Sequence, residues 1–137
     1  MKAIYVFLLS SLLLVHAEDS NTNKLATIYY VPFDADTYTP LTMGDIMKRA
    51  AYNIEVKNTK TRSELSDITS SGSKTANFDD SRVRLLIVYD ESKQQIFVDA
   101  VGNISDGKAQ RALTTRNFDK LKKLLSELTG KVPIKSR

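Results

Sequence analysis

The segment from 82 to 89 constrains the fold more than any other part of the chain. Its residues alternate in direction, with one side formed by Val83, Leu85, Ile87 and Tyr89 and the other by Arg82, Arg84, Leu86 and Val88. Because β-branched and large apolar residues occur on both sides, the segment predicts an interior strand of a sheet.

Further strands are predicted on both sides of this segment. Residues 26–33 are rich in β-branched and aromatic types, and Tyr52, Ile54 and Val56 alternate with polar residues. A turn at 90–93 leads into an alternating stretch at 95–100, which predicts an antiparallel hairpin. Asp106-Gly107 predicts a second tight turn before a short strand near 110–113. The sheet is therefore expected to be mainly antiparallel.

Three helices complete the predicted fold. A short helix is expected at 43–51 with Thr42 as its N-cap, and a second, polar one at 61–71 that stops at Gly72. The third has a candidate cap at Thr114 or Thr115, ends near Gly130 and Pro133, and carries an apolar stripe of Phe118, Leu121, Leu124, Leu125 and Leu128. Such a stripe can bind a membrane surface or a partner helix, but it more often packs on a sheet. The predicted class is α+β, with two short helices and one C-terminal amphipathic helix packed on the sheet.

The first 17 residues have the pattern of a secretory signal peptide. A positive start at Met1-Lys2 precedes an apolar run over 3–15, and Val15-His16-Ala17 is a suitable cleavage site. The run is shorter than the roughly 20 residues that a transmembrane helix needs. Cleavage after Ala17 would leave a single domain, 18–137. Exported domains of animals and fungi usually depend on disulfides, so the absence of cysteine favours a bacterial periplasm.

Cleavage would also remove the only histidine, His16, from a chain that has no cysteine. The remaining domain could not contain a Ser-His-Asp triad, a Cys-His pair, the usual nitrogen or sulfur zinc site, or histidine-ligated haem. Serine-lysine chemistry is not expected either, because Ser73-Lys74 and Ser92-Lys93 lie in predicted turns where lysine stays hydrated. We therefore expect no enzyme and no cofactor or metal site.

Two loops contain the candidate binding residues. Asp34 and Asp36 lie two apart beside Tyr38, so in an extended segment both carboxylates project to the same side. Calcium binding or a glycosidase pair is conceivable there, but calcium needs six or more oxygen ligands and glycosidase carboxylates normally come from separate elements. The alternative is an acidic turn.

The second loop precedes the central strand and contains Phe78, Asp79 and Asp80. It can present an aromatic ring and two acids to a basic partner cleft, where complementary charge speeds association. The alternative is that Phe78 fills part of the core while an aspartate makes a local turn.

The charge balance limits the class of partner. Without Lys2 there are 19 basic and 16 acidic residues, a net charge of about +3 with no concentrated basic stripe, so nucleic acid is not an expected partner. Basic residues gather only towards the C-terminus, at Lys120, Lys122, Lys123, Lys131, Lys135 and Arg137. Two interpretations of these residues are a solvated helix face and an envelope-associated surface that binds anionic lipid or cell-wall polymer.

The order of several segments resembles a class of bacterial proteins. These segments are Tyr29-Tyr30-Val31-Pro32-Phe33-Asp34, then Tyr38-Thr39-Pro40-Leu41-Thr42, then Phe78-Asp79-Asp80-Ser81-Arg82-Val83-Arg84, then the 118–128 helix. The pattern is similar to small exported α+β immunity or inhibitor proteins that act against cell-wall-active toxins and enzymes. The resemblance implies a periplasmic protein that neutralises a partner protein by occupying its cleft, without catalysis of its own.

Overall fold

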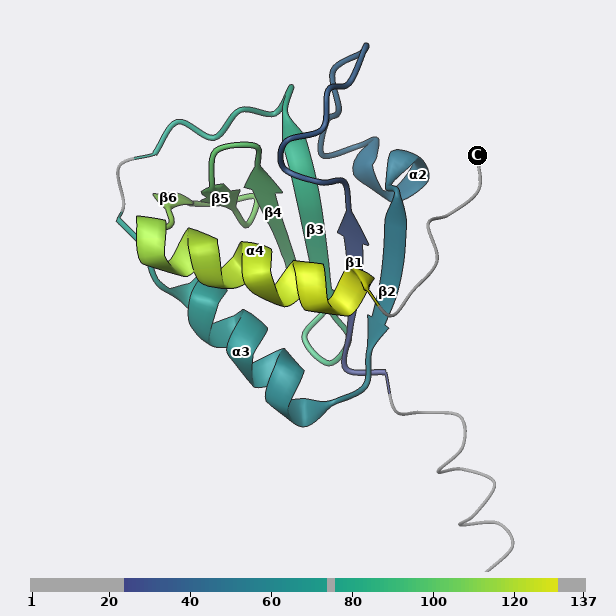
Figure 1. Cartoon of the computed structure of the whole chain (residues 1–137). Coiled ribbons are helices and arrows are strands. Elements are labelled where there is room, and N and C mark those ends of the chain that lie inside the picture. The colour runs from purple at the N-terminus through teal and green to yellow at the C-terminus, as the bar shows by residue number, and fades with distance from the viewer. Residues whose placement is uncertain (1–23, 74–75, 131–137) are drawn as a thin grey trace, which may run out of the picture.

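The computed structural model describes residues 24–73 and 76–130 and has the predicted α+β class, with one six-stranded antiparallel sheet and three helices in this part of the chain (Figure 1). The predicted signal peptide, Pro133 and the basic residues beyond 130 lie outside the described residues. In chain order the elements are β1 (Ala26–Tyr30), α2 (Ile46–Arg49), β2 (Tyr52–Val56), α3 (Thr59–Ser70), β3 (Val83–Tyr89), β4 (Gln95–Asp99), β5 (Asn103–Ser105), β6 (Gln110–Ala112) and α4 (Thr115–Thr129).

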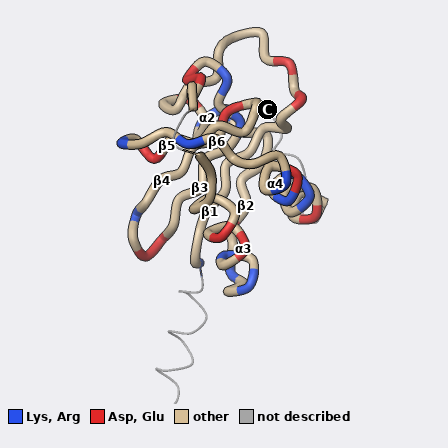
Figure 2. The backbone as a smooth tube through the Cα atoms, turned by 90° about the vertical axis from the view of Figure 1, so that its left-hand side faces the viewer, with Lys and Arg blue, Asp and Glu red and all other residues tan. Residues whose placement is uncertain are grey.

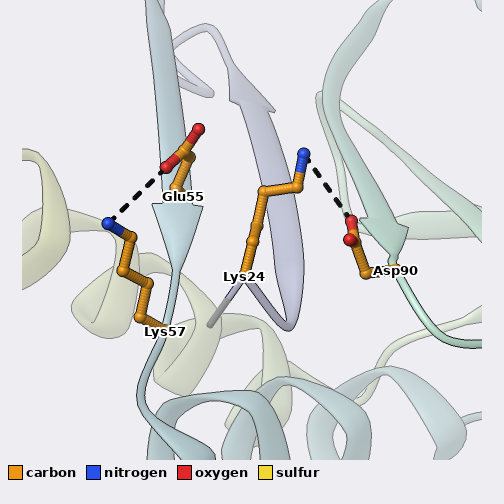
Figure 3. Close-up of polar contacts among 4 residues, drawn as sticks. All are labelled: Lys24, Glu55, Lys57 and Asp90. Carbon is orange, nitrogen blue, oxygen red and sulfur yellow. Dashed lines mark ion pairs between the residues drawn. The ribbon is translucent and has the colours of Figure 1, made fainter. Parts of the chain in front are cut away.

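The strands lie in the order β2-β1-β3-β4-β5-β6, and every neighbouring pair is antiparallel. The predicted interior strand, β3, lies between β1 and β4 as expected. The edge strand β2 carries Glu55, which pairs with Lys57 at 3.9 Å, while Lys24 pairs with Asp90 at 3.8 Å across the ends of β1 and β3 (Figure 3). Charges on an edge strand oppose pairing with another chain's strand.

One face of the sheet is covered by α3 and α4, which run side by side across it (Figure 1). The apolar stripe of α4 faces the sheet, with Leu121, Leu124 and Leu125 buried, and α3 contributes Leu65 and Ile68. These side chains pack against residues that alternate along the strands, such as those of β1 and β3. The predicted packing of the amphipathic helix on the sheet is confirmed.

The other face is covered mainly by loop segments and the single turn of α2. Val31, Leu41 and Ile46 pack there with Leu86 and Phe97 of the sheet. These segments connect β1 to β2 and project beyond the end of the sheet, at the top of Figure 1. The two faces therefore differ in the kind of structure that covers them.

The sequence pattern is wrong about Val83. The pattern placed it on the same side as Leu85, but Val83 packs on the loop-covered face with Leu86, whereas Leu85 packs on the helix-covered face. The register between β3 and β4 shifts between Val83 and Leu85, because Val83 lies opposite Asp99 while Leu85 lies opposite Val98. Arg84 is the extra residue of this β-bulge, which breaks the alternation of sides.

The helix boundaries also differ from the expected ones. The first helix begins at Ile46 rather than at 43, because Thr42 donates its hydroxyl to the Asp45 carboxylate at 3.0 Å and does not cap a helical N–H. The last helix has the predicted cap, since the Thr114 hydroxyl accepts from the Asn117 amide at 3.1 Å. The cap at Thr114 satisfies a free N–H of the first turn and fixes the start of α4 just after β6.

Candidate functional site

The segment from Phe33 to Pro40 forms a projecting loop, which we call the 33–40 loop. Phe33 anchors its beginning, with its ring packed edge-on against Phe118 of α4 at 4.9 Å between centroids. Leu41 anchors its end: this residue is 1% exposed, its amide donates to the Ser81 carbonyl at 3.1 Å, and its carbonyl accepts from the Val83 amide at 2.9 Å. Both ends of the loop are thus fixed to the sheet and its helices.

Two arginines from other elements bind the backbone of this loop. Arg49 of α2 donates to the Pro40 carbonyl at 2.7 Å and to the Thr39 carbonyl at 3.4 Å. Arg84 of β3 donates to the Ala35 carbonyl at 3.2 Å. A loop that is held by charged donors at several points loses less conformational entropy when it binds a partner.

The three candidate residues of this loop are all exposed. Tyr38 has a relative exposure of 108%, and the Asp34 and Asp36 side chains also face solvent. Figure 2 shows acidic positions along the loop that projects beyond the sheet. Phe33, at the start of the same loop, packs against the core, whereas the Tyr38 ring is fully exposed. Full exposure of a large aromatic side chain is unusual.

A polar cleft of about 370 Å³ lies at the base of the loop. Asp34, Asp36 and Tyr38 line it together with Arg82, which directly precedes β3, and Arg84 of β3. The three ion pairs found among the described residues involve none of these four charged side chains. The cleft therefore carries two acids and two guanidinium groups that do not neutralise one another directly.

The second predicted loop lies next to the first, and its candidate residues contact other segments of the protein or their own turn. Phe78 is half-buried against the apolar cluster of the loop-covered face. The Asp80 carboxylate accepts from the Met43 amide at 2.8 Å and so joins the second loop to the turn that precedes α2. The Asp79 carboxylate accepts from the amide of Ser81 at 2.9 Å and from its hydroxyl at 2.5 Å. None of these three side chains lines the polar cleft.

The pKa of Asp79 is lowered, chiefly because the Ser81 hydroxyl donates to its carboxylate and secondly because the Ser81 amide does so. Both donors favour the ionised carboxylate. The contacts of Asp79 are those of a local turn, and its role in partner binding remains a prediction.

Sequence reasoning missed Asp99, the residue that organises this end of the sheet. Its side chain is fully buried at the end of β4 and accepts four N–H groups: the amides of Asp79 (3.0 Å), Val101 (3.0 Å) and Asn103 (2.9 Å), and the Asn103 side chain (3.1 Å). A buried carboxylate is stable when its oxygens are paired in this way. Asp99 thus ties the second loop to the turn between β4 and β5.

Arg84 and Arg49 were also missed as functional candidates. The signal for Arg84 was present, because a charged residue lies within an otherwise apolar strand. The position of its side chain depends on the β-bulge, and the bulge is visible only in the pairing of β3 with β4. Arg49 had no comparable signal, since basic residues near a helix end are common.

The basic residues of α4 lie on a mixed surface. Lys122 pairs with Asp119 at 3.3 Å and lies over the Phe118 ring at 4.6 Å. Lys120 and Lys123 line a shallow groove between α3 and α4 that also contains acidic side chains, and Figure 2 shows both charges along α4. The apolar stripe of the same helix is buried against the sheet.

The described residues contain neither a cluster of metal ligands nor a helix that could span a membrane. Within 24–73 and 76–130, no group of three or more histidine, cysteine, aspartate or glutamate side chains is placed to hold a metal ion. No helix in those same ranges has the length and apolar character needed to cross a bilayer. The site that the residues do form is a charged cleft below an exposed loop tip.

Comparison of the chain with protein-family models, curated proteins and solved structures found no match.

Proposed function

We propose that this protein is a non-enzymatic periplasmic binding protein that inhibits a partner protein, such as a cell-wall-active toxin or enzyme, by inserting the 33–40 loop into the partner's cleft. The observation that carries the proposal is the full exposure of Tyr38 on a loop whose two ends are fixed. The export signal predicted at 1–17 supports the location.

A projecting tyrosine suits this role for physical reasons. Its ring offers a large contact area at the cost of only two side-chain torsions, and tyrosine is enriched among the residues that dominate binding energy. Asp34 and Asp36, on the same loop, add negative charge that would speed association with a basic cleft. Because Arg49 and Arg84 hold the loop backbone, the loop would bind with little rearrangement.

The test uses the purified protein immobilised and exposed to periplasmic extract, followed by mass spectrometry of what is retained. A photo-reactive phenylalanine analogue at position 38 should crosslink the retained partner, and the same analogue at position 101 should not. Val101 is a matched control because it is also exposed, at 61%, but lies in the turn between β4 and β5. The purified partner should then lose activity when the protein is added.

Variants of the loop sharpen this test. Tyr38→Ser should weaken partner binding by roughly 2 kcal/mol or more, a hot-spot effect, and leave the thermal midpoint unchanged because Tyr38 is fully exposed. Val101→Ser should have little effect on binding. Arg49→Gln should weaken binding by a smaller amount because it removes donors to Pro40 and Thr39. If Tyr38→Ser binds the partner as tightly as the unmodified protein, the loop is not the inhibitory element.

A further inference from the structure

The start of β3 presents a buried cation that has no acidic partner. Arg84 is 4% exposed and forms no ion pair with any described residue. Its terminal nitrogens donate to the carbonyls of Val83 at 3.1 Å and Ala35 at 3.2 Å, while Nε has no acceptor within the described ranges. Buried arginines are normally paired, because an isolated buried charge is costly.

The β-bulge explains how this side chain reaches its position. Val83 lies across from Asp99 of β4, and Leu85 lies across from the next residue, Val98. Arg84, between them, has no partner of its own and is the extra residue of the bulge. A bulge redirects a side chain from the regular alternation of a strand, and bulges are over-represented beside functional sites. Here Arg84 lines the polar cleft under the 33–40 loop, and its guanidinium donates to the Ala35 carbonyl of that loop.

The surroundings of Arg84 determine which ligand would suit it. Arg82 lines the same cleft and adds a second, exposed guanidinium. Burial, and next the nearby Arg82 charge, lowers the pKa of Arg84, and only Asp36 opposes this shift. An anion bound near the two guanidiniums would reduce their mutual repulsion and offset the cost of burying Arg84 without an acidic partner.

We propose that this cleft is a binding site for a small carboxylate, held by Arg84 at its base and by Arg82 at its rim. A carboxylate matches the planar guanidinium with two parallel hydrogen bonds. Asp34 and Asp36 line the same cleft and repel a dianion more than a monoanion, so a carboxylate should bind in preference to phosphate. The cleft, about 370 Å³ in volume, has room for a small carboxylate. Because Arg84 is only 4% exposed, a small ligand can approach it more closely than a protein surface can.

The proposal does not depend on the inhibitor function. Sodium acetate is added to ¹⁵N-labelled protein at pH 7, with sodium chloride adjusted to keep the ionic strength constant. Saturable shifts with one common midpoint are expected at the amides of Ala35, Arg82 and Arg84. Acetamide, the neutral analogue, should cause none, and phosphate should bind more weakly than acetate. Shifts that stay linear in acetate, or phosphate binding at least as tight as acetate, would overturn the assignment.

Matched variants locate the site. Arg82→Gln changes an exposed residue and should weaken acetate binding by about tenfold, whereas Arg116→Gln, an equal charge change at the start of α4, should leave it unchanged. Arg84→Lys keeps the charge but loses the planar fork, so it should weaken binding at least as much. Asp36→Asn should strengthen binding and narrow the preference over phosphate.

A variant that fails to fold would also fail to bind acetate, so folding is checked separately. Arg84→Lys changes a buried residue, so its amide spectrum and thermal midpoint are compared with those of the unmodified protein. If it fails to fold, Arg82→Gln and Asp36→Asn still decide the result. Equal acetate midpoints in Arg82→Gln and Arg116→Gln would show that the cleft is not the site. Loss of acetate binding with intact partner inhibition would separate this proposal from the inhibitor function.

Discussion

The two faces of the sheet are stabilised in different ways. On the helix-covered face, α3 and α4 bury aliphatic side chains in a continuous core. On the loop-covered face the apolar cluster is smaller, and single polar residues position the covering segments: Arg49, Asp80, Arg84 and Asp99 each bind backbone groups of a loop. Helices satisfy their own backbone groups, but a loop that covers a sheet needs partners for its carbonyls and amides.

This difference explains where charge is found. A helix-covered face can be entirely apolar, whereas the polar residues that hold a loop bring charges to its base. The cleft with Arg82, Arg84, Asp34 and Asp36 lies where the 33–40 loop leaves the sheet. The face that is less apolar is therefore the one that contains the candidate site.

The largest expected effect is on the helix-covered face. Leu121→Ala removes a fully buried side chain of α4 and should lower the free energy of unfolding by about 2–5 kcal/mol, through lost burial and the cavity that remains. Denaturant unfolding measures this value. Lys123→Ala, on the exposed side of the same helix, should change stability by no more than about 0.5 kcal/mol. Similar values for the two variants would contradict the packing of α4.

Asp99→Ala tests the polar network of the loop-covered face. It leaves four N–H groups without their acceptor and should cost about 2–4 kcal/mol. Hydrogen exchange should accelerate first at Asp79, Val101 and Asn103, before the amides of α4 are affected. Asp67→Ala on the exposed side of α3 is the control. Uniform acceleration across both faces would show that the two regions are not separable.

Gly102→Ala probes the junction between the two faces. Gly102 has a φ of +92°, and an added Cβ would lie 2.6 Å from the Phe118 ring of α4. We expect a loss of about 1–3 kcal/mol from overpacking and backbone strain. Gly107→Ala has a similar φ of +88° with open space around the Cβ, so it should show only the strain, about 1 kcal/mol. Thermal or denaturant unfolding of both variants gives the difference.

The smallest expected effect concerns Asp79. Its lowered pKa means that its ionised form stabilises the fold above the unfolded-state value of about 3.9, and that this stabilisation is lost as the pH falls through the folded-state pKa. Ser81→Ala removes the hydroxyl donor and should raise the Asp79 pKa towards its ordinary value. Carboxyl chemical shifts measured against pH test this, with Ser63→Ala as the control. An unchanged Asp79 pKa in Ser81→Ala would assign the shift to another cause.

Residues in regular elements could be predicted because their environment is local and periodic. The alternation in β3 from Leu85 onward, the stripe on α4 and the cap at Thr114 each follow from the spacing of a few neighbouring residues. Asp34, Asp36 and Tyr38 were chosen because acids and an aromatic residue cluster in one loop, and all three are exposed; their role in partner binding stays a prediction. Arg49 and Asp99 could not be found in this way, since their partners lie up to 20 residues away in the sequence.

The sequence by itself determined the α+β class, the interior position of β3 and the helix face that packs on the sheet, because hydrophobic periodicity acts over a few residues. Only the tertiary structure decided the bulge at Arg84, the burial of Asp99 and the meeting of the 33–40 loop with the start of β3. The register of two strands and the hydrogen bonds between distant loops depend on the whole sheet, so no short segment encodes them. The charged cleft is a product of that long-range arrangement.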